Sequence, residues 1–166
     1  MFKIFELLFF KKFVEDVIIP ASNEAMEKGS DALTYSEFLV YLGIWFLMAT
    51  IIGPSRKEWF LSLPIDQFDG TPYRMNGYMA GQQFEQILTA LRFTTKEKPN
   101  YVDRFWQVRD MITAWKDNMF AAFTPGWVSC LDESMSTWIN KYTCPGFIFC
   151  PRKPWPFGNE YHTIAD

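Results

Sequence analysis

The pattern of apolar and polar positions predicts a long helical region followed by a shorter region of β-strands. Residues 3–19 carry apolar side chains at steps of three and four, which predicts an amphipathic helix that ends at Pro20. Residues 38–52 form an uncharged apolar run that is shorter than the roughly twenty residues of a membrane span, so it predicts a buried helix. Similar patterns predict helices over residues 81–93 and 101–122.

Local signals place the ends of the helix that contains the apolar run. Thr34 and Glu37 match the T-x-x-E capping box, in which each side chain bonds a free amide of the first helical turn. Gly53, which a proline follows, predicts the end of this helix. Ser55 and Glu58 repeat the capping pattern and predict a second, shorter helix.

The longest predicted helix has one apolar face, which we expect to lie in the core. Its members recur at helical spacing: Phe105, Val108, Ile112, Trp115, Met119 and Ala122. Earlier in the chain, residues 64–78 contain two prolines and two glycines and are expected to form a loop.

Beyond residue 123 the helical spacing gives way to short apolar runs. Residues 124–126, TPG, predict a turn. Strands are expected over residues 127–131, 147–150 and 160–166, the last entered from a proline-rich segment.

These patterns predict a mainly helical α+β chain with two regions. Residues 1–123 form a helical region, and residues 124–166 form the first strands of a sheet. A hydrophobic content of 49% and an aromatic content of 19% over 166 residues exclude a disordered chain. So much aromatic surface also suggests that part of it awaits a partner or further chain.

The charge of the chain is small but uneven. The net charge is −3, so bulk electrostatics does not point to nucleic acid. Residues 1–91 hold seven Lys and Arg against eleven Asp and Glu, whereas residues 92–153 hold nine against six. The second part is therefore compatible with a phosphate-bearing partner.

The cysteines and the single histidine do not form a known pattern. Cys130, Cys144, Cys150 and His162 lack the close cysteine pair of structural zinc sites, so we interpret the cysteines as reduced thiols. Ser134 and His162 lack the third partner that a nucleophilic triad requires, and we expect His162 to be a strand residue with an ordinary polar partner.

Two adjacent carboxylates, Asp132 and Glu133, follow an apolar run in the segment GWVSCLDESMSTW at residues 126–138. A buried acid is costly unless a partner compensates it. Asp132 is therefore either a polar residue bonded to nearby backbone amides or part of a site. Alternation along a strand places Glu133 on the opposite face, so the two are not expected to share a ligand.

An ordered series of motifs covers nearly the whole chain. These are SNEAM at 22–26, FLVYLGIWFLMATIIGPSRKEWF at 38–60, FEQILTALRF at 84–93, DRFWQVRDMI at 103–112, PGWVSCLDESMSTW at 125–138 and PRKPWPFG at 151–158. In this order they resemble the piggyBac-type transposases and their domesticated relatives.

The resemblance implies a helical dimerisation and DNA-binding region followed by an RNase H-like catalytic domain with three metal-binding aspartates. The first of these matches Asp132, and the other two lie downstream of the PRKPWPFG segment, beyond Asp166. Asp166 itself matches an aspartate that the family does not use for chemistry. The implied cofactor is Mg²⁺ or Mn²⁺, since both prefer hard oxygen ligands. The implied partners are transposon-end DNA and a second copy of the chain, in the nucleus and away from membranes.

Basic side chains near the strands are candidates for contact with DNA phosphates. Arg152 and Lys153 lie in the proline-rich segment, and Lys141 stands near the place where many relatives have a Gly-Arg pair. Trp155, between two prolines, could stack on a base or fill a pocket of further chain. Three other arginines are expected to be solvated or paired with nearby acids: Arg92, Arg104 and Arg109.

The sequence therefore predicts a fragment or remnant of a cut-and-paste DNA transposase. One catalytic aspartate cannot hold two metal ions, so we expect the 166-residue chain to be inactive alone. The alternative is a domesticated, non-catalytic module for DNA binding or dimerisation. A third interpretation, a membrane anchor at residues 38–52, fits less well because the run is short and capped.

Overall fold

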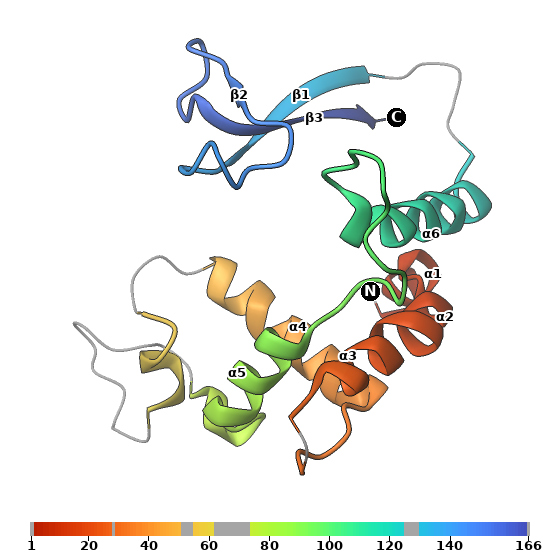
Figure 1. Cartoon of the computed structure of the whole chain (residues 1–166), viewed down its shortest axis with the longest axis vertical. Helices are drawn as coiled ribbons and strands as arrows, with labels where there is room; N and C mark the ends of the chain where they lie inside the picture. Colours follow the sequence, from red (N-terminus) through yellow and green to blue (C-terminus); the bar gives the residue numbers. More distant parts are fainter. Residues whose placement is uncertain (1, 28, 51–54, 62–73, 125–129, 166) are drawn as a thin grey trace. The chain divides into compact units, whose positions relative to one another are not determined.

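The chain forms two compact units in the computed structural model (Figure 1). One unit is Lys11–Lys96, and the other joins Met1–Phe10 to Glu97–Asp166. The predicted boundary between a helical region and a sheet region at residue 123 stays a prediction. The structure describes residues 2–27, 29–50, 55–61, 74–124 and 130–165.

The first unit begins with a helix of changing pitch. α2 (Lys11–Phe13) continues into a π-helical turn over Val14–Ile18 and then into α3 (Ile19–Ala25). The prediction that Pro20 ends a helix was wrong, because Pro20 lies in the first turn of α3. A proline is tolerated there since its missing N–H has no essential partner in a first turn.

The capping box predicted for the apolar run is confirmed. α4 (Tyr35–Thr50) begins after Thr34, whose hydroxyl accepts a hydrogen bond from the Glu37 amide at 3.2 Å. In return the Glu37 carboxylate accepts from the Thr34 amide at 2.9 Å. The predicted helix end at Gly53 lies outside the described residues. Ser55 donates its amide to Glu58, which opens a 3₁₀ turn at Glu58–Phe60.

The core of this unit is aromatic and lies between α4 and α5 (Gly81–Ala90). Phe84 is fully buried, and its ring centroid lies 4.9 Å from that of Tyr41 and 5.1 Å from that of Phe60. A Cβ on Gly81 would lie 2.9 Å from the Phe60 Cβ, so this position needs a glycine unless Phe60 shifts.

Two polar residues of the SNEAM motif hold this core together. Ser22 is fully buried, and its hydroxyl accepts a hydrogen bond from the Arg92 amide at 3.0 Å. The Asn23 amide group bonds both backbone groups of Leu33, donating to its carbonyl at 3.1 Å and accepting from its N–H at 2.6 Å. These contacts satisfy buried or half-buried polar groups and fix the path between α3 and α4. The loop predicted over 64–78 is described only from residue 74, where Met75–Gly77 forms a 3₁₀ turn.

In the second unit, α1 (Phe2–Leu8) contacts α6 (Trp106–Ala122). The Asn118 side-chain amide donates to the carbonyls of Leu8, at 2.8 Å, and Leu7, at 3.2 Å. The prediction that the apolar face of α6 lies in the core was wrong: no α6 residue is fully buried, and Trp115 is 52% exposed. Periodicity indicates which face is apolar, but burial also needs a partner surface, and the short α1 covers little of α6.

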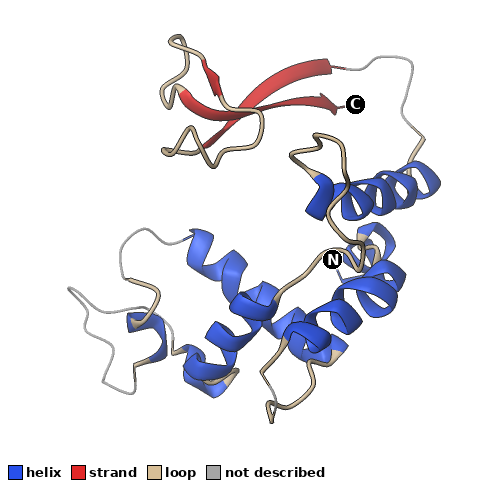
Figure 2. Ribbon diagram, viewed as in Figure 1, coloured by secondary structure: helices blue, strands red, loops and turns tan. Residues whose placement is uncertain are grey.

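A three-stranded antiparallel sheet completes the second unit (Figure 2). β1 (Cys130–Thr137) is an edge strand, β3 (Phe157–Ala165) is central, and the short β2 (Ile148–Phe149) lies on the other side. The second and third predicted strands are confirmed by β2 and β3, although β3 begins earlier than predicted. The first, predicted over 127–131, is described only at residues 130 and 131, which lie in β1. The predicted turn at 124–126 is described only at its first residue, and residues 125–129 lie outside the described part.

The glycine that ends the PRKPWPFG segment has a precise structural requirement. Gly158 pairs with Thr137 and has a φ of +149°, a conformation that other residues rarely adopt. A Cβ here would lie 1.9 Å from the Ser136 carbonyl oxygen. The close approach of β3 to β1 therefore depends on a glycine.

The predicted combination of helices with a small sheet is thus confirmed at the level of fold class. Across the described ranges, none of the helices has the length and hydropathy needed to cross a membrane.

Candidate functional site

Asp132 is the third residue of β1 and lies inside the strand, not at its end. Its backbone pairs with Thr163 of β3. The side chain is exposed, and its Oδ1 accepts a hydrogen bond from the Glu133 amide at 2.8 Å. No other hydrogen bond reaches this carboxylate from the residues that the structure describes. The carboxylate therefore has the backbone contact of an ordinary polar residue and is also free to meet a ligand.

The neighbouring acid belongs to the other face of the sheet. Glu133 pairs with His162, and strand alternation places both on the face opposite Asp132. His162 Nε2 lies 2.8 Å from Glu160 Oε1, which confirms the polar partner predicted for it. In the described part of β1 and β3, alternation leaves Asp132 as the one acid on its face.

Lys153 links the proline-rich segment to the strand that carries Asp132. Its Nζ donates a hydrogen bond to the Glu133 carbonyl at 2.8 Å, one residue beyond Asp132. This contact confirms that Lys153 lies beside the sheet. Arg152 is exposed and makes no ion pair with any described residue, and Trp155 is 70% exposed. A DNA-binding role for these side chains stays a prediction.

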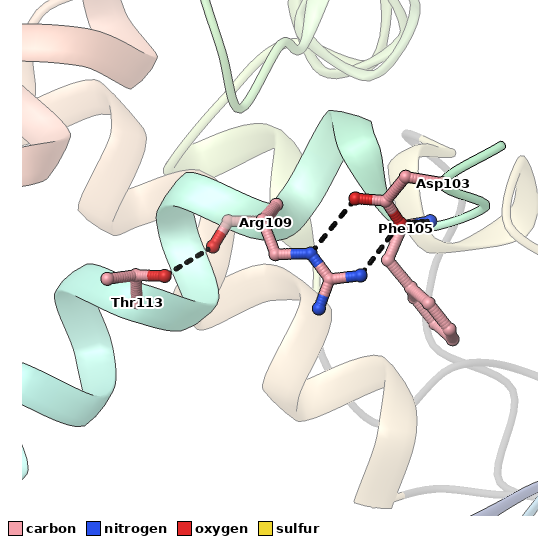
Figure 3. Close-up of polar contacts among 4 residues, drawn as sticks. All are labelled: Asp103, Phe105, Arg109 and Thr113. Atoms are coloured by element: carbon pink, nitrogen blue, oxygen red, sulfur yellow. Dashed lines mark hydrogen bonds and ion pairs between the residues drawn. The ribbon is translucent and has the colours of Figure 1, made fainter. Parts of the chain in front are cut away.

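Arg109 is committed to an ion pair, as predicted. Figure 3 shows its guanidinium facing the Asp103 carboxylate, with distances of 2.7 Å from Nη2 to Oδ1 and 3.1 Å from Nε to Oδ2. The hydrogen bonds from Arg109 and from the Phe105 amide lower the pKa of Asp103. This two-point contact anchors the segment that precedes α6 to its first turns.

The other two arginines of the helical region differ from one another. Arg92 was expected to be solvated or paired with an acid, but its guanidinium donates to the backbone carbonyls of Thr89 and Leu91 at the end of α5. Arg104 is exposed and has no ion-pair partner within the described ranges.

The sequence did not predict a groove in the second unit. It has a volume of about 800 Å³ and lies between residues 98–106 and residues 141–145, which include Lys141. The Lys141 ammonium lies 5.0 Å from the Tyr142 ring centroid. The sequence offered one signal for this groove, a tyrosine within a polar segment in each wall, Tyr101 and Tyr142. Only the fold shows that the two segments lie side by side.

The described residues contain no cluster of three potential metal ligands, since no three His, Cys, Asp or Glu side chains converge there. The three cysteines are free thiols, and the buried Cys144 donates to Asn159 Oδ1 at 3.0 Å. Asp132 supplies a hard oxygen that suits Mg²⁺ or Mn²⁺, but one carboxylate does not make a site for two ions.

Comparison with known families decides the origin of this arrangement. The model of the Transposase IS4 family matches residues 2–166. The chain belongs to this family of piggyBac-type transposases. The match covers both the helices and the sheet.

Two similar proteins are longer than this chain. The human PiggyBac transposable element-derived protein 3 is 27% identical over 156 residues, which are 93% of this chain and 25% of the human protein. A piggyBac transposase, solved in a synaptic complex with hairpin DNA, has a TM-score of 0.71 at 19% identity. That alignment covers 98% of this chain and 35% of the solved chain, and it supports the fold. The chain thus spans about a quarter to a third of the length of these relatives.

Proposed function

We propose that this chain is a fragment of, or a remnant derived from, a piggyBac-like cut-and-paste DNA transposase. Asp132 is then the first of three metal-binding aspartates. The observation that carries the proposal is the position of Asp132: an exposed carboxylate inside a paired strand, in a chain that matches the transposase family along its length.

The sheet is proposed to be the first part of an RNase H-like sheet. β1 pairs with β3 along one edge, and no strand of the described chain pairs with its other edge. A further strand beside β1 would bring a second carboxylate toward Asp132. Such carboxylates would together hold two divalent ions, which would supply activation of water, and later of a 3′-hydroxyl, for attack on a phosphodiester. Within this chain, Asp132 supplies one ligand and its strand fixes where that ligand lies.

The proposed partner is transposon-end DNA. Support comes from the family match and from the solved relative, whose structure is a complex with hairpin DNA. Lys141, Arg152 and Lys153 are the proposed phosphate contacts, since each extends from a loop of the second unit. The nucleus is the proposed location, since a chromosomal substrate would lie there, and the helical region is proposed to pair with a second copy.

A second candidate function is a non-catalytic DNA-binding or dimerisation module retained after domestication. The observation in its favour is the presence of exposed cations without acidic partners, such as Arg104 and Arg152, within the described residues. This module and the transposase fragment share a DNA-binding surface and differ in whether metal chemistry exists in the whole protein.

The purified 166-residue chain tests the proposal that Asp132 is only one part of a catalytic set. We expect no Mg²⁺- or Mn²⁺-dependent cleavage of DNA, because three carboxylates are needed to hold two ions. Cleavage is measured on supercoiled plasmid with the wild type and Asp132→Asn. Ser134→Ala is the matched control, since Ser134 is exposed on the same face of β1.

The same preparations are titrated with duplex DNA across a salt series. Salt-sensitive binding without cleavage agrees with both candidate functions, and binding that is absent at low salt removes the second. Reproducible nicking by the 166-residue chain that Asp132→Asn abolishes would contradict the proposal that Asp132 alone cannot support cleavage.

A further inference from the structure

The groove beside α6 joins two segments that are distant in sequence. One wall is the segment 98–106, which leads into α6, and the other is the loop 141–145, which follows β1. Beside the groove the two segments come close together, because a Cβ on Gly146 would lie 3.7 Å from Phe105 Cζ. Cys144, in the second wall, is 2% exposed. The groove is therefore built by packing within one unit.

The charge on the lining is positive. Lys98, Arg104 and Lys141 line the groove and make no ion pair within the described ranges. The one acid of the lining, Asp103, is held by two nitrogens of Arg109, Nε and Nη2 (Figure 3), and its side chain is 14% exposed. A bidentate partner neutralises this acid, so the three cations face the groove without a competing carboxylate.

The groove also carries exposed aromatic rings. Tyr142 is 87% exposed and Tyr101 is 67% exposed, on opposite walls. The Tyr142 amide donates to Asn140 Oδ1 at 3.0 Å, which holds the backbone of this loop in place. A tyrosine kept in solvent on an ordered loop offers a flat face to a ligand.

Cations and exposed aromatic faces together suit one class of ligand. Single-stranded nucleic acid combines phosphates, which lysine and arginine attract, with unpaired bases, which stack on aromatic rings. A duplex satisfies the cations equally well but keeps its bases stacked on one another. An apolar peptide would leave the three cations without partners. The volume of about 800 Å³ lies within the range of about 300–1,000 Å³ that is usual for ligand sites.

We infer that the groove between residues 98–106 and 141–145 binds single-stranded DNA. Lys98, Arg104 and Lys141 contact successive phosphates, and an unpaired base stacks on Tyr142. The inference rests on the proposed function, because DNA opened during transposition is the source of the single strand. The groove itself involves neither Asp132 nor a metal ion.

The test measures binding of a fluorescent oligo-dT strand by anisotropy across a salt series. Replacing Lys98, Arg104 and Lys141 with Gln removes three phosphate contacts, so the slope of log K against log salt should fall by about two. The matched control replaces Lys12, Lys57 and Lys116, which are exposed and are not among the residues that line the groove, and should keep the wild-type slope. Melting temperatures of both triple variants check that they fold.

Tyr142 separates stacking from charge. Tyr142→Ala should weaken binding of the strand by about 5- to 100-fold, whereas Tyr142→Phe keeps the ring and should bind like the wild type. A duplex of the same length is the competitor, and Tyr142→Ala should leave its affinity unchanged.

The outcomes distinguish this inference from the proposed function. If the groove variants bind the strand as the wild type does while duplex binding persists, the groove is not the site and the proposed function stands. If Asp132→Asn weakens strand binding as much as the groove variants do, the separation of the two sites is wrong. If the wild type binds no DNA of either kind, both the inference and the proposed DNA-binding role fail.

Discussion

Gly158 shows how a single residue determines whether β1 and β3 can pair. Its Cα faces the backbone of Ser136 so closely that a methyl group would overlap the carbonyl oxygen. The same pairing sets the register that places Asp132 opposite Thr163. Gly158, the last residue of the PRKPWPFG motif, is therefore required for the pairing of β3 with β1, the strand that carries Asp132.

Replacing Gly158 with Ala should destabilise the chain by about 3 kcal/mol, because it combines a disfavoured φ with a backbone overlap. Chemical denaturation measures the change. The control is Gly43→Ala in α4, where a Cβ meets no atom within 4 Å and where alanine should stabilise the helix by up to about 1 kcal/mol. Equal stability of Gly158→Ala and the wild type would show that β3 does not pair with β1 as described.

At the scale of an element, α4 depends on the reciprocal bonds between Thr34 and Glu37. Two hydrogen bonds to the Glu37 carboxylate lower the pKa of Glu37 below its usual value of 4.5. The bond from the Thr34 hydroxyl has the larger effect, and the bond from the Thr34 amide has the next largest. A pKa lowered in the folded state means that the unfolded chain binds a proton first as the pH falls. The contribution of Glu37 to stability is therefore present above pH 4.5 and is lost as the pH falls through its folded pKa.

Glu37→Gln should flatten the acid limb of the stability curve. Glutamine still caps the first turn but has no charge to lose, so the variant should lose less stability than the wild type below pH 4.5. The measurement is the free energy of unfolding at a series of pH values from 7 to about 3. The idea fails if the two curves stay parallel, since the charge of Glu37 then contributes nothing to the pH dependence.

The elements that the sequence predicted well are those with local causes. α4 begins at a capping box and α5 follows helical periodicity, and both signals act within a few residues. The prediction that a helix ends at Pro20 failed because a new helix begins directly after the π-helical turn, with Pro20 in its first turn. The prediction that the apolar face of α6 is buried failed because the burial of Trp115 depends on what packs against it. The periodicity of the helix carries no information about that partner.

At the scale of the whole molecule, the order of helices and strands was predictable, but the convergence of distant segments was not. The strand that carries Asp132 was indicated by a short apolar run before an acid. The groove was not, because its walls are separated by α6 and β1 and meet only through non-local packing. The partner of Lys153, a backbone carbonyl, was likewise invisible in the sequence.

The central claim, that Asp132 is a metal ligand of a transposase, is tested most directly by DNA cleavage. The protein to use is a whole transposase of the kind that the proposed function implies, with residues 1–166 of this chain in place, in the presence of Mg²⁺ or Mn²⁺ and transposon-end DNA. We predict that Asp132→Asn lowers cleavage at least about 100-fold while DNA binding persists, given that losing even an outer partner of a metal ligand costs about 10–100-fold. Ser134→Ala should cleave like the wild type. Cleavage by Asp132→Asn at the wild-type rate would contradict the account.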